Sequence, residues 1–241
     1  MTAAGKATAV IAAAGSGERL GAGAPKALVE IAGRPILAWC LDAFADAHSV
    51  EAIVVAAPVA HEDAVEKLLP EGLAAEVVRG GSTRAESVQA AMTAVDGDVV
   101  AIHDAARPLV TAGLIDELVE ALAARPEAAG VIAATPLTDT VKRAMEPRPA
   151  GGPPSGGAAE VARTESRDHL WAAQTPQVFR ADVLRAALAA GPDRIAAATD
   201  ESTLVEEAGG TVLIHPSPAA NLKVTTPHDL EIGELLLAMR P

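Results

Sequence analysis

Short apolar runs of strand length recur along this chain and alternate with segments of helical length. The runs stop at or before glycine, proline or aspartate, and they are Thr8–Ala13, Ala52–Ala57, Val99–His103, Gly130–Ala134 and Thr211–His215. Four other segments have the length of helices: Ile36–Ala47, Thr83–Ala94, Thr111–Ala124 and Pro227–Met239. Continuous apolar strands that alternate with helices are typical of a parallel sheet covered on both faces. The pattern therefore predicts an α/β fold with a mainly parallel sheet and helices on both faces.

Length and charge narrow the class of protein. A chain of 241 residues is long enough to bury roughly three quarters of its unfolded surface, so we expect one domain over residues 1–241. The 19 Lys and Arg against 32 Asp and Glu give a net charge of −13. This balance argues against a nucleic-acid surface, where clustered basic residues supply most of the affinity. The single cysteine, Cys40, excludes a disulfide framework and a cysteine-rich zinc module.

The sequence gives no sign of a membrane segment or an export signal. Charged residues or prolines interrupt every apolar stretch before it reaches membrane-spanning length. The first six residues lead directly into a strand-like run without the pattern of a signal peptide. We therefore expect a cytoplasmic protein without a membrane partner.

One segment departs from the alternation of strands and helices. Residues Ala144–Glu160 are rich in proline and glycine and have no periodicity, which predicts a flexible loop. The flanking segments Thr140–Arg143 and Glu160–Thr164 alternate like the two strands of a hairpin. We interpret the region from about 138 to 168 as an arm that projects from the main body.

A glycine-rich loop follows the first predicted strand, from Ala14 to Lys26. Glycines let backbone N–H groups approach phosphates closely, and Arg19 and Lys26 add positive charge to the same loop. The spacing does not fit a dinucleotide-binding motif, which would need glycine at Leu20, nor a Walker A loop, because Lys26 follows Pro25. The alternative is an ordinary strand-to-helix loop with two solvated cations.

A second polar motif, His103–Pro108, directly follows a buried strand. Asp104 is thus placed at the carboxyl edge of the sheet, where α/β proteins bind ligands. Its carboxylate suits a Mg²⁺ ion that also touches a substrate phosphate, and Arg107 could pair with a second anionic substrate. In the alternative, Asp104 is a turn or helix-cap residue with Arg107 as its surface partner. We expect His103 to be buried and structural.

A third motif, Gly80–Ser87, precedes a predicted helix. Glu86 lies three residues after Thr83, as in a helix-capping box, and that local role is sufficient by itself. The alternative is recognition of a base or ribose by backbone and hydroxyl groups.

Further polar clusters carry little weight one by one. They are Thr138–Arg143, Arg163–Arg167, Trp171–Gln177, Ala198–Glu201 and Asn221–Thr225. Together and in this order, however, the segments AAGSGERLGAGAPK, GGSTRAES, HDAARP, TDTVKR, AQTPQ, TDE and NLKVT closely resemble the 2-C-methyl-D-erythritol 4-phosphate cytidylyltransferase family of the non-mevalonate isoprenoid pathway. The resemblance extends from Ala9 to about Leu235.

The resemblance implies a Rossmann-like nucleotidyltransferase fold with a protruding β-arm that helps to form a homodimer. It also implies a reaction: transfer of CMP from CTP to 2-C-methyl-D-erythritol 4-phosphate, giving 4-diphosphocytidyl-2-C-methyl-D-erythritol and pyrophosphate, with Mg²⁺ or another divalent cation. Because the last predicted helix lies close to the final residue, we expect the cyclase domain that is fused in some relatives to be absent. Ala27 stands where we expect glutamine in many members, and the GGPPSGG stretch makes the tip of the arm longer than expected.

Site residues follow from the resemblance by position in the motifs. It implies catalytic roles for Arg19, Lys26, Arg167 and Lys223. It implies CTP binding by Ala13, Ala14, Gly15, Gly17, Gly81, Ser82, Ser87, Asp104 and Ala105, with Asp104 holding the metal. It implies contacts to methylerythritol phosphate by Arg107, Thr140, Arg167, Thr175 and Lys223, of which Thr140 and Arg167 reach the substrate from the partner subunit's arm.

The implied reaction brings two anions together. A phosphate monoester is already largely deprotonated near pH 7, so catalysis should come from alignment and fixed positive charge, without a strong base. Two alternatives remain at this point. One is a cytidylyltransferase for another polyol phosphate, such as ribitol 5-phosphate. The other is a non-catalytic nucleotide-sensing module on the same fold.

Overall fold

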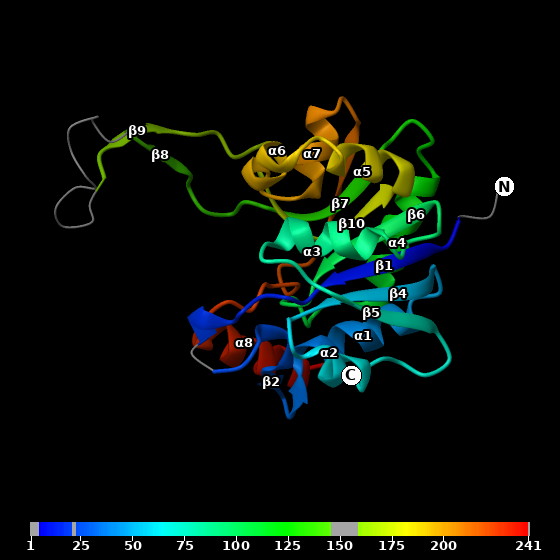
Figure 1. Cartoon of the computed structure of the whole chain (residues 1–241). Coiled ribbons are helices and arrows are strands. Elements are labelled where there is room, and N and C mark those ends of the chain that lie inside the picture. Colours follow the sequence, from blue (N-terminus) through cyan, green and yellow to red (C-terminus); the bar gives the residue numbers. More distant parts are fainter. Residues whose placement is uncertain (1–4, 21–22, 146–158, 241) are drawn as a thin grey trace.

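A seven-stranded sheet forms the centre of the protein in the computed structural model, which describes residues 5–20, 23–145 and 159–240 (Figure 1). From edge to edge the strands are β11 (Val212–Pro216), β7 (Gly130–Pro136), β10 (Trp171–Arg180), β6 (Val99–Asp104), β1 (Ala7–Ala12), β4 (Val50–Ala57) and β5 (Ala74–Arg79). All neighbouring pairs are parallel except those of β10, which runs antiparallel to both β6 and β7. The predicted mainly parallel sheet is confirmed.

The five predicted strands are present with ends shifted by two residues or fewer, but β5 and β10 were not predicted. β10 escapes the apolar pattern because it carries polar residues in its middle, Gln174, Thr175 and Gln177. All three are less than a tenth exposed and find hydrogen-bond partners on other segments. A hydrophobicity pattern cannot predict that a polar side chain is buried when its hydrogen-bond partners lie far along the chain.

Helices cover both faces of the sheet, as predicted. One face packs against α1 (Ile36–Asp46), α2 (Glu62–Glu66) and α4 (Ala112–Ala123). The other packs against α3 (Arg84–Met92), α5 (Ala181–Leu188), α6 (Pro192–Ala197) and α7 (Glu201–Glu207). Strand β1 contributes to the hydrophobic core on each face. Ile11 packs in the core under α1, α2 and α4, and its neighbour Val10 packs in the core under α3, α5, α6 and α7, because successive side chains of a strand point to opposite faces.

A third, smaller core lies beyond the carboxyl edge of the sheet. The last helix, α8 (Pro227–Ala238), packs there against the short hairpin of β2 (Glu30–Ile31) and β3 (Arg34–Pro35). The contact is close, since a Cβ on Gly233 would come within 2.6 Å of the Ile31 side chain. Val224 belongs to the same core, so this packing anchors the loop that connects β11 to α8.

The predicted arm is present as a hairpin that projects from the body (Figure 1). Strands β8 (Lys142–Ala144) and β9 (Val161–Thr164) pair antiparallel with Lys142 opposite Thr164. Beyond Thr164, Glu165 accepts hydrogen bonds from Arg143 and Arg163, which fastens the base of the hairpin. The predicted flexible tip falls mainly on residues 146–158, which lie outside the described residues. No helix in the described ranges has the length and apolar character needed to cross a membrane.

Candidate active site

A cavity of about 770 Å³ opens at the carboxyl edge of the sheet, where β1 and β6 end side by side. The register pairs Ala12, the last residue of β1, with Asp104, the last residue of β6. The lining of the cavity includes all nine residues predicted to bind the nucleotide, together with Lys26 and Lys223. Segments far apart in the sequence thus meet in one place, as expected for the carboxyl ends of neighbouring parallel strands.

The glycine-rich loop closes back on itself to form one wall. The amide of Lys26 donates to the carbonyl oxygen of Gly15 over 3.1 Å, which returns the end of the loop to its start. Gly17 has a φ of +73°, and a Cβ there would lie 3.0 Å from the Ala24 oxygen and from the Lys26 nitrogen. Only glycine fits this backbone conformation and this contact without strain. The loop therefore presents Lys26 to the cavity; the side chain of Arg19 lies outside the described part.

The segment before α3 forms the opposite wall and has the predicted capping box. The Thr83 hydroxyl accepts from the Glu86 amide, and the Glu86 carboxylate accepts from the amide and hydroxyl of Ser82. The Ser87 hydroxyl donates to the Thr83 carbonyl and accepts from the amide of Gly81. These local bonds account for the shape of the wall, so any role in recognising a nucleotide is additional to capping.

Asp104 is a nearly buried carboxylate held between two cations. Arg84 Nε donates to its Oδ1 over 2.6 Å, and Lys223 Nζ lies 2.7 Å from its Oδ2. Burial alone would raise the pKa of Asp104, but the charges of Arg84 and Lys223 outweigh burial and hold it well below its usual range. The carboxylate is therefore ionised throughout the physiological pH range. The alternative that Arg107 is its surface partner is wrong, because Arg84 and Lys223 occupy that position.

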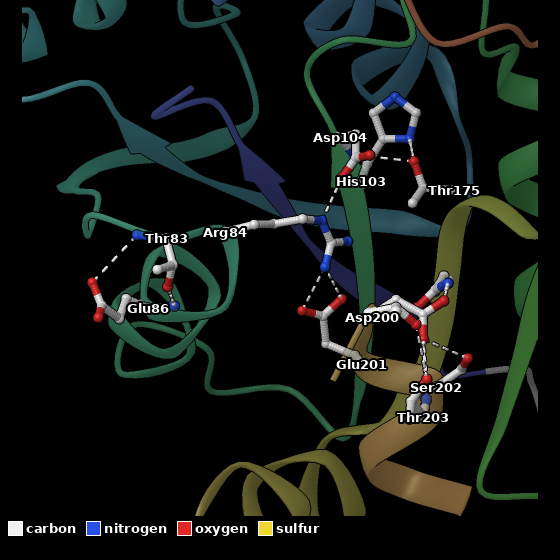
Figure 2. Close-up of polar contacts among 12 residues, drawn as sticks. Thr83, Arg84, Glu86, His103, Asp104, Thr175, Asp200, Glu201, Ser202 and Thr203 are labelled. Atoms are coloured by element: carbon white, nitrogen blue, oxygen red, sulfur yellow. Dashed lines mark hydrogen bonds and ion pairs between the residues drawn. The ribbon is translucent and has the colours of Figure 1, made fainter. Parts of the chain in front are cut away.

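Arg84 is a site residue that the sequence analysis did not single out. It is the first residue of α3, lines the cavity, and reaches from Asp104 to Glu201, where Nη1 donates to both carboxylate oxygens over 2.7 and 2.6 Å (Figure 2). Burial would lower the pKa of Arg84, but the two carboxylates outweigh it and raise the pKa. Arg84 lies within GGSTRAES and Glu201 within TDE, so the motifs contained the signal without revealing that the two residues meet.

Lys223 is positioned by a buried asparagine. The Asn221 side chain, 2% exposed, donates to Gln174 Oε1 and to the Thr175 carbonyl of β10. The Val224 amide donates to the Ala106 carbonyl over 2.8 Å on the other side of Lys223. These bonds fasten the loop at both sides of Lys223 and direct its ammonium toward Asp104.

Two predicted substrate-binding residues lie behind the cavity wall. The Thr175 hydroxyl accepts from the Asp104 amide and contacts His103 Nδ1 at 3.0 Å (Figure 2). Arg107 Nη1 donates to the Asn221 carbonyl over 2.8 Å, and its Nε is buried without a hydrogen-bond partner in the described part of the chain. Neither residue is among the described lining of the cavity. Both support Asp104 and the Lys223 loop in this structure.

His103 is buried and structural, as predicted. It is fully inaccessible, its Nε2 lies 3.3 Å from the Arg107 carbonyl, and burial lowers its pKa to about 3. The imidazole is therefore neutral near pH 7 and carries no charge into the site.

The predicted arm residues Thr140 and Arg167 are not brought to the cavity of their own chain. Both are exposed, and Arg167 donates to the carbonyl of Thr138 at the root of the arm. Within the described ranges they are absent from the cavity lining.

The donor set at the cavity fits a magnesium ion that is held mainly by substrate. Among the described residues no group of three His, Cys, Asp or Glu side chains is arranged to hold a metal. Mg²⁺, however, keeps several waters and is commonly bound through one or two carboxylates plus substrate phosphates. Asp104 supplies one ionised carboxylate at the cavity wall, and each of its oxygens has lone pairs beyond those used by Arg84 and Lys223.

Comparisons with known proteins match this chain to one family. The sequence profile of the family 2-C-methyl-D-erythritol 4-phosphate cytidylyltransferase matches residues 7–239. Proteins of that name from Prochlorococcus marinus (strain MIT 9313) and Frankia casuarinae are 40% and 44% identical over 234 and 232 residues. These alignments cover 96% and 95% of this chain, and 98% and 80% of the relatives.

The fold also matches solved structures. The crystal structure of 2-C-methyl-D-erythritol 4-phosphate cytidylyltransferase from Thermus thermophilus superimposes with a TM-score of 0.76 at 31% identity. The match covers 97% of this chain and 100% of that one.

Burial of neutral His103 makes the stability of the protein depend on pH. The pKa of His103 is about 3 in the folded protein and near 6.5 in the unfolded chain. Above pH ~6.5 both states hold a neutral imidazole and the fold has its full stability. As the pH falls from ~6.5 toward 3, the unfolded chain binds a proton that the folded protein does not, and the free energy of unfolding decreases. The loss between pH 7 and 5 is on the order of 2 kcal/mol. In His103→Gln, urea unfolding at pH 7, 6 and 5 should show a shallower decline; an unchanged slope would show that His103 does not titrate as the burial requires.

Proposed function

This chain belongs to the 2-C-methyl-D-erythritol 4-phosphate cytidylyltransferase family, and we propose that its cavity at the carboxyl edge binds both substrates of that reaction. The enzyme transfers CMP from CTP to 2-C-methyl-D-erythritol 4-phosphate in isoprenoid biosynthesis, releasing pyrophosphate. One observation carries the assignment of the site: the nine predicted nucleotide-binding residues, Lys26 and Lys223 all line one cavity.

The glycine-rich loop binds the triphosphate in this proposal. Its backbone follows the end of β1, and Lys26 returns to the cavity through the bond to Gly15. Arg19 on the same loop adds a second cation. Lys26 and Arg19 neutralise the α-phosphate and the leaving pyrophosphate, where negative charge accumulates during transfer. Gly81, Ser82 and Ser87 line the opposite wall, and Ala13 and Ala14 also line the cavity. In this proposal they would contact the cytosine and ribose.

The Lys223 side of the cavity binds methylerythritol phosphate. The Lys223 side chain is 40% exposed, so its ammonium can contact a second anion while it remains near Asp104. An oxygen of the phosphate monoester then attacks the α-phosphorus of CTP, a new P–O bond forms, and the bond to pyrophosphate breaks in line. The monoester is already deprotonated, so no side chain has to remove a proton. Alignment by fixed cations supplies the catalysis.

Asp104 is the residue that would hold a divalent cation against the triphosphate. Such an ion neutralises phosphate charge when bound. Arg84 and Lys223 keep the carboxylate of Asp104 ionised and fixed at the cavity wall, where it could bind such an ion. Arg107 and Thr175, which the family motifs place near the polyol phosphate, contribute from behind the wall by holding the Lys223 loop and the Asp104 amide.

We further propose a single domain that acts as a cytoplasmic homodimer with shared sites. Thr140 and Arg167 lie on an arm that projects away from the body (Figure 1) and are absent from the described lining of their own cavity. If both residues contact substrate, as the family motifs indicate, they must do so at the cavity of another copy. The arm would thus complete the partner's site with positive charge from Arg167.

Substrate preference tests the function directly. Pyrophosphate release from CTP should be at least tenfold faster with 2-C-methyl-D-erythritol 4-phosphate than with ribitol 5-phosphate, at equal subsaturating concentrations of each. Equal or faster turnover of ribitol phosphate would assign the polyol site to the alternative substrate. Absence of turnover with both, despite CTP binding, would favour the nucleotide-sensing alternative.

Lys26 is expected to be essential for turnover and not for folding. Lys26→Ala should lower kcat on the order of 10²–10³-fold, the usual cost of losing one preorganised donor, while the far-UV circular dichroism stays that of the wild type. Lys67→Ala, outside the cavity, is the control and should keep wild-type turnover. Wild-type turnover in Lys26→Ala would remove this residue from the mechanism.

Shared sites predict rescue between two inactive chains. In a mixed dimer of Lys26→Ala with Arg167→Ala, one of the two cavities has an intact Lys26 and an intact Arg167 from its partner. Mixing the two variants should therefore restore up to about a quarter of wild-type activity, since half of the dimers are mixed and each has one intact site. No gain after subunit exchange, checked with differently tagged chains, would contradict completion of the site in trans.

A further inference from the structure

The first turn of α7 carries a buried carboxylate, Glu201, to which the proposed reaction assigns no role. Glu201 is 1% exposed, and both of its oxygens accept from Arg84 Nη1. It is not among the described residues that line the cavity. A buried carboxylate is costly to desolvate unless it is paired, and burial does raise the pKa of Glu201 despite the attraction of Arg84. Arg84 is thus the cation that pairs with Glu201 in the interior.

The guanidinium of Arg84 transmits position from Glu201 to Asp104. It is planar and rigid, so fixing Nη1 at Glu201 also fixes where Nε points. Nε donates to Asp104 Oδ1 (Figure 2), and Asp104 is among the residues that line the cavity. Arg84 also lines the cavity, so an incoming triphosphate would compete with Asp104 for it. A second carboxylate behind Arg84 holds it in place against that competition.

Glu201 is itself fixed from the core of the sheet. Asp200 caps α7 by accepting from the Thr203 amide, and its other oxygen accepts from the Gln177 side chain over 2.8 Å. Gln177 lies on β10 and is 1% exposed. Figure 2 shows Asp200 and Thr203 at the start of α7, next to Glu201. The helix therefore cannot shift Glu201 away from Arg84 without breaking bonds to the central sheet.

We propose that Glu201 is a positioning residue for cytidylyl transfer, which holds Arg84 so that Asp104 keeps its orientation when the anionic substrates enter. The proposal rests on the role of Asp104 given above. The site groups two cations and two carboxylates, Arg84, Lys223, Asp104 and Glu201, whose charges sum to zero. Substituting Glu201 by Gln changes this sum, whereas substituting it by Asp keeps the sum and alters only the geometry, so the two effects can be measured separately.

Glu201→Gln is the principal test, with kcat and KM measured at saturating levels of the second substrate. Loss of orientation should lower kcat about tenfold or more. The KM for CTP should stay equal or fall, because the cavity region gains one net positive charge. Glu207→Gln, on the same helix with an exposed pair to Arg194, is the matched control and should keep wild-type kcat. Wild-type kcat in Glu201→Gln would overturn the proposal.

A coupling experiment and a charge-conserving variant exclude a merely structural role. If Glu201 acts through Arg84, the double variant Arg84→Gln/Glu201→Gln should be no slower than Arg84→Gln alone; additive losses would contradict the proposal. Glu201→Asp keeps the charge but shortens the side chain, and its kcat should also fall. Rates are divided by the folded fraction, measured by circular dichroism at the assay temperature, so a loss explained by unfolding counts against the proposal.

Asp104→Asn separates this inference from the proposed site. If Asp104→Asn loses turnover while Glu201→Gln keeps it, the positioning role is wrong and the site stands. If Asp104→Asn keeps wild-type turnover, the role of Asp104 is wrong, and Glu201 cannot act through it.

Discussion

The carboxylate of Asp104 is the point on which the site depends, because three distant segments converge there. It ends β6, and it pairs with Arg84 from the start of α3 and with Lys223 from the loop after β11. Each pair is short and shares one nearly buried carboxylate, so the two cations and the carboxylate fix one another's positions. A buried carboxylate without these partners would be protonated or the fold would lose stability. The same interaction thus keeps Asp104 charged and shapes the cavity.

Buried polar residues of the antiparallel strand β10 support this arrangement from behind. Gln174 and Thr175 bind the Asn221 side chain that fastens the Lys223 loop, whereas Gln177 binds the cap of α7. An apolar strand in this position would fill the sheet equally well but would leave these loops without partners. The net charge of −13 is compatible with a cationic cavity, because charges farther apart than about 10 Å are largely screened while those within the cavity are not.

Much of the fold could be predicted because local patterns agree with it. The apolar runs predicted five strands, and Thr83 and Thr226 mark the starts of α3 and α8 through side chains that bond within four residues. The resemblance of the motifs to the family supplied the predicted nucleotide-binding residues, and all nine of them line one cavity. β5 and β10 were missed: β5 is an edge strand that is only half buried, and the polar residues of β10 conceal its burial.

By itself, then, the sequence determined the α/β class, the glycine-rich loop, the position of Asp104 at a strand end, and the arm. Each of these features depends on residues that are close together in the chain, and for such residues the spacing in the sequence indicates the local structure. Only the tertiary structure decided that Arg84 and Lys223 are the partners of Asp104, that Arg107 and Thr175 lie behind the cavity wall, and that Glu201 meets Arg84. Those pairings join residues up to 119 positions apart, such as Asp104 and Lys223. The order of strands in the sheet determines which of these residues meet, and the spacing of nearby residues does not predict that order.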